Sequence, residues 1–157
     1  MSTSEALALG NYEQTVPPMD GPQARANQFV TFYIGDNAYG IDIMAVREIR
    51  SWTPTTDLPD QAHGARGVLD IRGSIVEVFD LSVVLGSGAR DHQANQVVLV
   101  VAIGDRDVGL AVDSVSDIVD AADSDFADPP KQGGKVAAIV RQNELLISVL
   151  DLDVLFH

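Results

Sequence analysis

The sequence predicts an all-β fold with short helices, built as two small five-stranded β-barrels that lie side by side. Short runs rich in β-branched and aromatic residues alternate with turns that contain Gly and Asp, which is typical of consecutive strands. The chain also contains an internal repeat, because residues 32–49 and 101–118 align at a constant offset of 69 positions. This period is too long for a solenoid and indicates two similar lobes, each of which can hide its strand edges by closing into a barrel.

Identical residues at matching positions carry the repeat. They are Ile34 and Ile103, Gly35 and Gly104, Asp36 and Asp105, Gly40 and Gly109, Val46 and Val115, and Ile49 and Ile118. The endings VFDL (78–81) and VLDL (149–152) recur at an offset of 71. We therefore expect a single domain over 28–157, with one lobe mainly in 28–88, a second mainly in 95–150 and a C-terminal turn in 151–157. Residues 1–27 have no sustained apolar pattern and are expected to form a flexible tail.

In the first lobe, residues 29–34 predict a strand that turns at Gly35 and pairs with 39–41. Asp42 is a suitable N-cap for a short helix, because Ile43, Val46 and Ile49 recur at near-helical spacing. The Pro-rich and Asp-rich residues 53–65 predict an irregular connection.

Residues 67–85 predict a β-hairpin that leads into a helical turn. The apolar runs 68–71 and 75–79 are joined across Arg72-Gly73-Ser74, so Arg72 is expected at the bend. In the second lobe, residues 121–134 are expected to form a loop, and Asp151 is expected to cap a last helical turn. The strands expected there are 97–103, 108–112, 115–119 (extended or partly helical), 136–141 and 145–150.

The composition excludes several classes of protein. The formal net charge of −13 disfavours nucleic-acid binding and adhesion to anionic lipid. No Cys is present, so disulfides and Cys-ligated metals are impossible. The sequence shows neither a basic and apolar leader at its start nor an apolar run long enough to cross a membrane, which predicts a cytoplasmic protein without direct membrane insertion.

No arrangement of residues points clearly to catalysis. His63, His92 and His157 lie in a loop, a linker and the terminus, away from any nucleophile or second metal ligand. Phosphate-binding glycine motifs are absent, and the Asp-rich span 105–128 lacks the Gly and Glu of a calcium-binding EF-hand loop. We expect no catalytic residues, no metal and no cofactor. A divalent-cation-binding protein or enzyme that uses the Asp-rich half remains an alternative.

Three segments, FVTFYIGDNAYGIDIMAVREI, GVLDIRGSIVEVFDL and DVGLAVDSVSDIV, together resemble the signature of the CheW-like domain of bacterial chemotaxis coupling proteins. The resemblance runs from Gln28 to Phe156. It implies two SH3-like five-stranded barrels and a non-enzymatic scaffold. Members of this family bridge the cytoplasmic tips of chemoreceptors to the regulatory domain of a histidine kinase, so a receptor and a kinase are the partners expected for this chain.

The resemblance also implies two binding sites. The residues at the positions of the family's kinase-contacting patch are Val46, Glu48 and Gly67. The residues at the positions of its receptor groove are Ile43, Arg72, Gly109, Val112 and Val115.

The chain departs from the family pattern near the hairpin bend. Asp70 stands where the family usually has Asn, and Glu77 stands where it usually has Pro. Asp70 lies two residues from Arg72, so its carboxylate could neutralise that guanidinium within the protein. A relative that serves a sensory pathway other than chemotaxis is a further alternative, which the sequence does not separate from the first.

Overall fold

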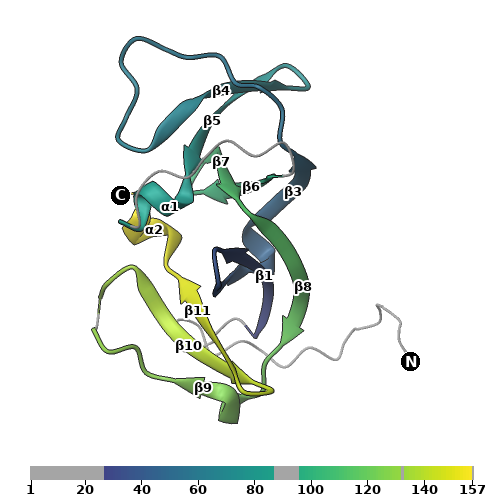
Figure 1. Ribbon diagram of the computed structural model, residues 1–157, viewed down its shortest axis with the longest axis vertical. Helices are drawn as coiled ribbons and strands as arrows, with labels where there is room; N and C mark the ends of the chain where they lie inside the picture. Colours follow the sequence, from purple (N-terminus) through teal and green to yellow (C-terminus); the bar gives the residue numbers. More distant parts are fainter. Residues whose placement is uncertain (1–26, 87–95, 132, 157) are drawn as a thin grey trace.

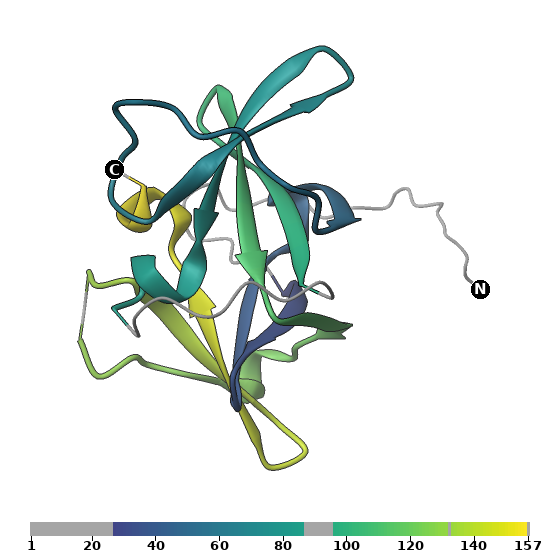
Figure 2. The ribbon, with the colours of Figure 1, turned by 45° about the horizontal axis from the view of Figure 1, so that its top comes forward.

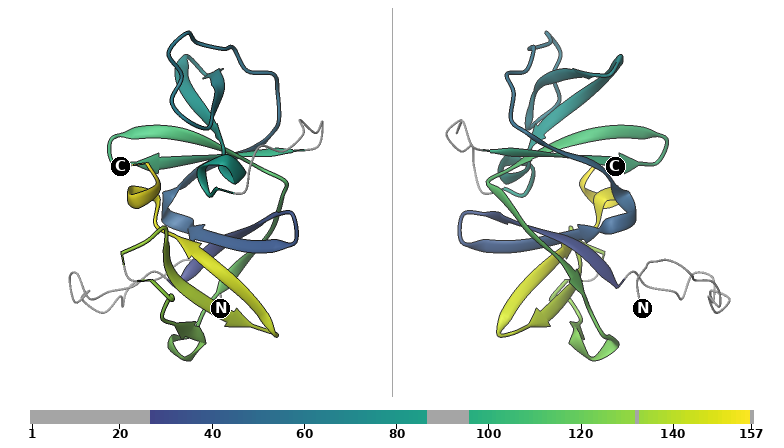
Figure 3. Two further views of the ribbon diagram at one scale, coloured as in Figure 1. Left: turned by 60° about the vertical axis from the view of Figure 1, so that its left-hand side comes forward. Right: turned by 90° about the vertical axis from the view of Figure 1, so that its right-hand side faces the viewer.

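The computed structural model describes residues 27–86, 96–131 and 133–156. Within these residues the chain forms one six-stranded and one five-stranded sheet, which lie one above the other with the short helices α1 and α2 at their shared boundary (Figure 1; Figure 3). The predicted all-β fold with short helices is therefore confirmed. The expected tail (1–27, apart from Asn27) and most of the linker between the expected lobes lie outside the described residues.

The elements follow one another closely along the chain. The strands are β1 (Gln28–Ile34), β2 (Asn37–Asp42), β3 (Val46–Ser51), β4 (Ala65–Ile71), β5 (Ser74–Asp80), β6 (Val97–Ile103), β7 (Arg106–Val112), β8 (Ser114–Asp120), β9 (Phe126–Ala127), β10 (Val136–Gln142) and β11 (Leu145–Leu150). The helices are the 3₁₀ turns η2 (Ile43–Ala45) and η3 (Asp123–Asp125) and the α-helices α1 (Leu81–Val84) and α2 (Leu152–Leu155).

The two sheets do not follow the expected division of the chain into 28–88 and 95–150. The six-stranded sheet has the order β8-β1-β2-β11-β10-β9, and the five-stranded sheet has the order β3-β6-β7-β5-β4. The third strand of each repeat therefore belongs to a different sheet from the first two strands of that repeat. β3 pairs with β6 in the five-stranded sheet, and β8 pairs with β1 in the six-stranded sheet. The reason is that β2 and β7 already carry parallel partners, β11 and β5, on their second edges.

Three apolar clusters form the core. The central cluster lies between the sheets and includes Phe32, Ile41, Leu99 and Leu110, which are all fully buried. Burial of each such side chain contributes about 1.5–3 kcal/mol to folding. The residues of a second cluster come from the five-stranded sheet, and those of a third come mainly from the six-stranded sheet. Each sheet therefore has the interior of a small barrel, and both share the central core.

The helix predicted after Asp42 is only one turn long. Asp42 caps η2 as expected, because its Oδ1 accepts from the backbone N of Met44 at 2.9 Å. Val46 then has φ −83° and ψ 123°, and the chain continues as β3. The prediction of a helix through Ile49 was wrong, since the pairing of β3 with β6 satisfies the backbone instead.

The hairpin prediction is confirmed. Ile71 pairs with Ser74, and Arg72 (φ 52°) and Gly73 (φ 89°) form the two-residue turn, as expected for type I′. The β10–β11 hairpin turns in the same way through Asn143 and Glu144, and the two hairpins project from opposite ends of the molecule (Figure 2).

The C-terminal prediction is also confirmed, because Asp151 caps α2 through the backbone N of Val154 at 3.1 Å. The expected loop at 121–134 contains two short elements, η3 and β9, and β9 pairs with β10.

Candidate functional site

An exposed ion pair lies at the open end of the five-stranded sheet. Glu48 on β3 accepts from Arg72 in the β4–β5 turn, with Arg72 Nη2 2.5 Å from Glu48 Oε1 and Nη1 3.5 Å from Oε2. Arg50 Nη1 lies 3.3 Å from the same carboxylate. β3 is an edge strand of this sheet, so the ion pair links that edge to the turn that follows the other edge strand, β4.

The two partners of this ion pair have perturbed protonation equilibria. The hydrogen bond from Arg72 lowers the pKa of Glu48 below its ordinary value of 4.5, against a smaller opposing effect of burial. The same bond raises the pKa of Arg72. The Arg72 side chain is 75% exposed and that of Glu48 is 24% exposed, so the guanidinium is open to a partner while it remains bound to Glu48.

A second contact joins Trp52, the first residue after β3, to Arg66 on β4. The Arg66 guanidinium carbon lies 3.9 Å from the centre of the Trp52 ring, a cation–π contact. Arg66 Nη1 also donates to Gln96 Oε1 at 3.0 Å. The pKa of Arg66 is lowered, because the effect of burial exceeds the opposing effect of the nearby Asp80 carboxylate. These contacts fix the connection between β3 and β4 against the barrel.

Asp70 does not fill the role that its position in the sequence suggested. Its Oδ1 accepts from the backbone N of Gly73 at 2.8 Å and so stabilises the turn. Arg72 is neutralised within the protein, but its partner is Glu48, which is 24 residues away along the chain.

Gly67 lies near the start of β4, away from the turn that carries Arg72. It is buried, has φ +116° and lies at a β-bulge, where the register of β4 and β5 shifts. A Cβ atom built on it would lie 2.5 Å from the carbonyl oxygen of Thr56. Thr56 in turn exchanges two backbone hydrogen bonds with Val68, at 2.8 and 2.9 Å. Only Gly fits here, so its role at this site is to let the connection cross β4 closely.

The residues expected to form a receptor groove do not share one surface. Val112 is 1% exposed and belongs to the central core, and Ile43 and Val115 are half-buried against the same core, as is Val46 of the kinase set. Gly109 is buried, and a Cβ there would lie 3.1 Å from side chains of β5 and β6. Arg72 lies instead in the β4–β5 turn, next to Glu48.

The sequence reasoning missed an exposed apolar residue at an equivalent position in each hairpin. Ile75 is 66% exposed and Leu146 is 55% exposed, and each is the second residue after the turn of its hairpin. The offset of 71 between the two hairpins already placed them at equivalent positions. Because Val76 and Val78 face the barrel interior, the alternation of a strand assigns Ile75 to the outside, and this signal could have identified it.

The described ranges contain no group of three or more His, Cys, Asp or Glu residues that could hold a metal ion. Across 27–86, 96–131 and 133–156, no helix has the length and apolar character needed to cross a bilayer.

Comparisons with known proteins agree with this architecture. The model of the CheW-like domain matches residues 28–157. A protein named chemotaxis protein CheW from Rhizobium meliloti is 39% identical over 103 residues, which are 66% of this chain and 66% of that protein. A probable chemotaxis protein CheW from Rhizobium etli is 33% identical over 134 residues, or 82% of this chain and 86% of the relative.

A solved structure is similar over most of its length. The scaffolding protein TtCheW from Thermoanaerobacter tengcongensis superimposes with a TM-score of 0.78 at 26% identity, over 85% of this chain and 94% of that one. The structural likeness extends the sequence match to the whole arrangement of two sheets. On the match over 28–157, the chain belongs to the CheW-like domain family.

Proposed function

We propose that this chain is a non-enzymatic adaptor that couples chemoreceptors to a histidine kinase in a chemosensory array, acting in the cytoplasm beside the receptor tips. Family membership and the likeness to a protein named as a scaffold support this role. The alternative of a cation-dependent enzyme in the Asp-rich half has no comparable support.

The observation that carries the proposal is the exposed Glu48–Arg72 pair at one end of the molecule. Its geometry combines Glu48 and Arg72, which the sequence had assigned to different partners, into one surface. We assign this surface to the kinase, together with Val46 on the same strand as Glu48 and Gly67 on the strand that leads to Arg72. A charged pair that is already ordered on the free protein can orient an incoming partner and speed its encounter.

The receptor is assigned to the half-buried apolar residues at the boundary of the two sheets. Ile43 and Val115 are partly accessible there and the buried Val112 packs in the same core, whereas Gly109 packs against Val78 and Val98 inside the five-stranded sheet. A receptor helix can dock on such a surface through aliphatic side chains spaced along one of its faces.

The test is a pair of titrations, one with the isolated regulatory domain of the cognate kinase and one with the receptor tip. We expect Glu48→Ala and Arg72→Ala each to weaken kinase binding by about tenfold or more, the loss expected when one partner of an interfacial charge pair is removed. Receptor binding should change by less than about twofold, because neither residue contributes to the receptor surface.

Arg47→Ala is the matched control. Arg47 lies on the same strand and pairs with Asp107 at 3.6 Å, but its side chain is 62% exposed and has no contact with Arg72 among those found in the described residues. Its kinase affinity should stay unchanged. The assignment fails if folded Glu48→Ala binds the kinase normally, if Arg47→Ala weakens binding as much, or if Arg72→Ala loses the receptor instead of the kinase.

A further inference from the structure

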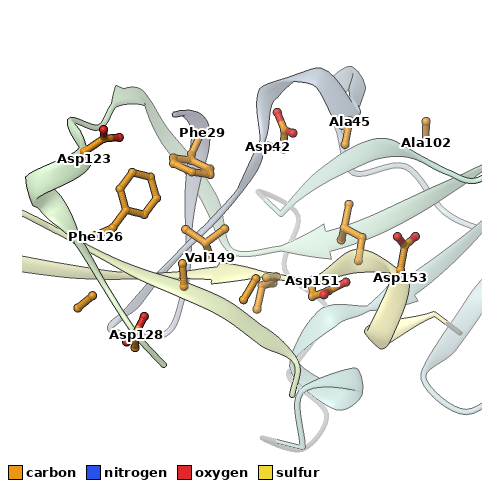
Figure 4. Close-up of a pocket in the computed structure, with 15 residues that line it drawn as sticks. Phe29, Asp42, Ala45, Ala102, Asp123, Phe126, Asp128, Val149, Asp151 and Asp153 are labelled. Carbon is orange, nitrogen blue, oxygen red and sulfur yellow. The ribbon is translucent and has the colours of Figure 1, made fainter. Parts of the chain in front are cut away.

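A groove of about 660 Å³ opens on one side of the six-stranded sheet, and neither Glu48 nor Arg72 is among the residues that line it (Figure 4). It runs from β9 and η3 to α2 and reaches the five-stranded sheet at Ala102 of β6. The volume lies in the range typical of ligand-binding pockets.

The floor of this groove is apolar. Phe29 and Phe126 meet edge to face with their ring centres 6.0 Å apart, and Val149 and Leu150 continue the floor along β11. Residues with small side chains give the groove its depth: Ala45, Ala102, Ala127, Ala137 and Ala138. An aliphatic or aromatic side chain of a ligand can therefore enter beside the Phe29–Phe126 pair.

The rim of the groove is acidic. Its charged lining residues are Asp42, Asp123, Asp128, Asp151 and Asp153. Among the residues that the structure describes, no Lys, Arg or His lines it. Asp42 and Asp151 cap η2 and α2, but no basic side chain forms a salt bridge with any of the five among the ion pairs of the described residues.

We propose that this groove docks a cationic amphipathic segment of a partner protein. One apolar side chain of the segment would pack on the Phe29–Phe126 pair, and flanking Lys or Arg residues would meet the rim carboxylates. The groove borders the proposed receptor surface, since its lining residues Asp42 and Ala45 flank Ile43, but none of the residues assigned to the kinase or to the receptor lines it.

Charge complementarity selects this occupant over the other candidates. A second copy of the chain has a formal charge of −13 and would be repelled by the rim. Residues 1–26 of the chain itself contain three acidic residues and one Arg, so they also have the wrong sign. In an amphipathic partner segment, Lys or Arg side chains complement the carboxylates of the rim, and an apolar side chain packs on the floor.

The test uses a fluorescein-labelled peptide with Leu and Lys at helical spacing, and a second peptide in which every Lys is replaced by Glu. The triple variant Asp123→Asn, Asp128→Asn and Asp153→Asn removes rim charges without touching either cap. The matched control, Asp57→Asn, Asp60→Asn and Asp105→Asn, removes the same charge from exposed positions outside the groove. Measured by fluorescence anisotropy, the Kd of the Lys peptide should be about tenfold higher for the rim variant and should change by less than about twofold for the control.

A second pair of variants tests the groove by shape. Ala137→Trp adds bulk to an exposed residue that lines the groove and leaves the charge unchanged, so it should abolish binding of the Lys peptide. Ala62→Trp, at an exposed position outside the groove, should bind as the unmodified protein does. Circular dichroism verifies that all variants are folded.

Three results would overturn the inference. Equal weakening by the two triple variants would mean that the peptide responds only to net charge. Normal binding by Ala137→Trp would place the peptide elsewhere, and tight binding of the Glu peptide would remove the electrostatic argument. Loss of the peptide site would leave the kinase and receptor titrations unaffected, so the two proposals fail separately.

Discussion

Replacing Gly67 by Ala should destabilise the protein far more than the same change at Gly73. Both glycines have positive φ, +116° and +89°, and both lie in the β4–β5 hairpin. They differ in their surroundings, because a Cβ at position 67 would lie 2.5 Å from Thr56 O, whereas nothing lies within 4 Å of one at position 73. The pair of variants therefore separates the steric contact from the backbone strain.

The expected magnitude follows from these contacts. A non-glycine residue in this backbone region costs about 1–3 kcal/mol. Moving the Thr56 carbonyl also strains its two hydrogen bonds with Val68, each of which contributes about 1 kcal/mol. Gly67→Ala should thus lower the free energy of unfolding by about 2–5 kcal/mol, and Gly73→Ala by about 1–2 kcal/mol.

Thermal unfolding followed by circular dichroism measures the difference. For a domain of this size, 1 kcal/mol corresponds to a Tm shift of about 3 °C, so we expect a loss of about 6–15 °C for Gly67→Ala and about 3–6 °C for Gly73→Ala. Equal shifts would refute the reasoning, because they would show that the crossing of the connection over β4 imposes no steric limit at position 67.

Two further predictions concern the ion pair and the core. Glu48→Gln should be less stable than the unmodified protein at pH 7, because the pKa of Glu48 is lowered in the folded state. The stabilisation by the ionised Glu48 is complete above the ordinary pKa of 4.5, and it is lost as the pH falls through the lower pKa of the folded protein. Urea midpoints of the two proteins should therefore converge as the pH falls below 4.5, and a gap independent of pH would contradict the assigned contact. Val112→Ala should cost about 2 kcal/mol in urea unfolding, since the side chain is 1% exposed in the central core. Receptor affinity measured on fully folded protein should be retained, and its loss would show that Val112 contacts the receptor directly.

Local features of the fold could be predicted from the sequence because they depend on neighbouring residues. The bend at Arg72 and Gly73 needs positive φ at two consecutive positions, and the sequence places it between two apolar runs. The caps Asp42 and Asp151 accept from backbone N–H groups within the next three residues.

The exchange of β3 and β8 between the sheets could not be predicted in this way. An apolar pattern reports that a strand is half-buried, but not which strand lies beside it. Val46 and Ile49 illustrate the limit, because their spacing of three fits a helix as well as a strand with a bulge, and β3 has a register shift between Val46 and Glu48.

The candidate site was only partly predictable for the same reason. Glu48 and Arg72 were each identified, yet their contact depends on the curvature of the five-stranded sheet, which brings the β4–β5 turn to β3. Asp70 was the nearer carboxylate in the sequence, but the turn uses it for the backbone N of Gly73.

The repeat gives the two barrels similar frames, but their ends differ in chemistry. Asp117 is the counterpart of Glu48 at the offset of 69, and it has no basic partner among the ion pairs of the described residues. Its backbone bonds instead to the Thr31 hydroxyl, at 3.1 and 3.2 Å. In the six-stranded sheet, the amide of Gln142 reaches β8 by donating to the carbonyl of Asp120 at 2.8 Å.

At the β10–β11 end, therefore, a neutral side chain contacts the backbone of β8, and none of the ion pairs of the described residues matches the Glu48–Arg72 pair. Two hairpin ends of similar shape would otherwise present the same surface to any partner, since Ile75 and Leu146 occupy equivalent exposed positions. The charges of Glu48 and Arg72 break this symmetry, and a partner that complements them gains nothing equivalent at the other end. An adaptor built from a duplicated barrel needs such a difference to hold its partners in one orientation.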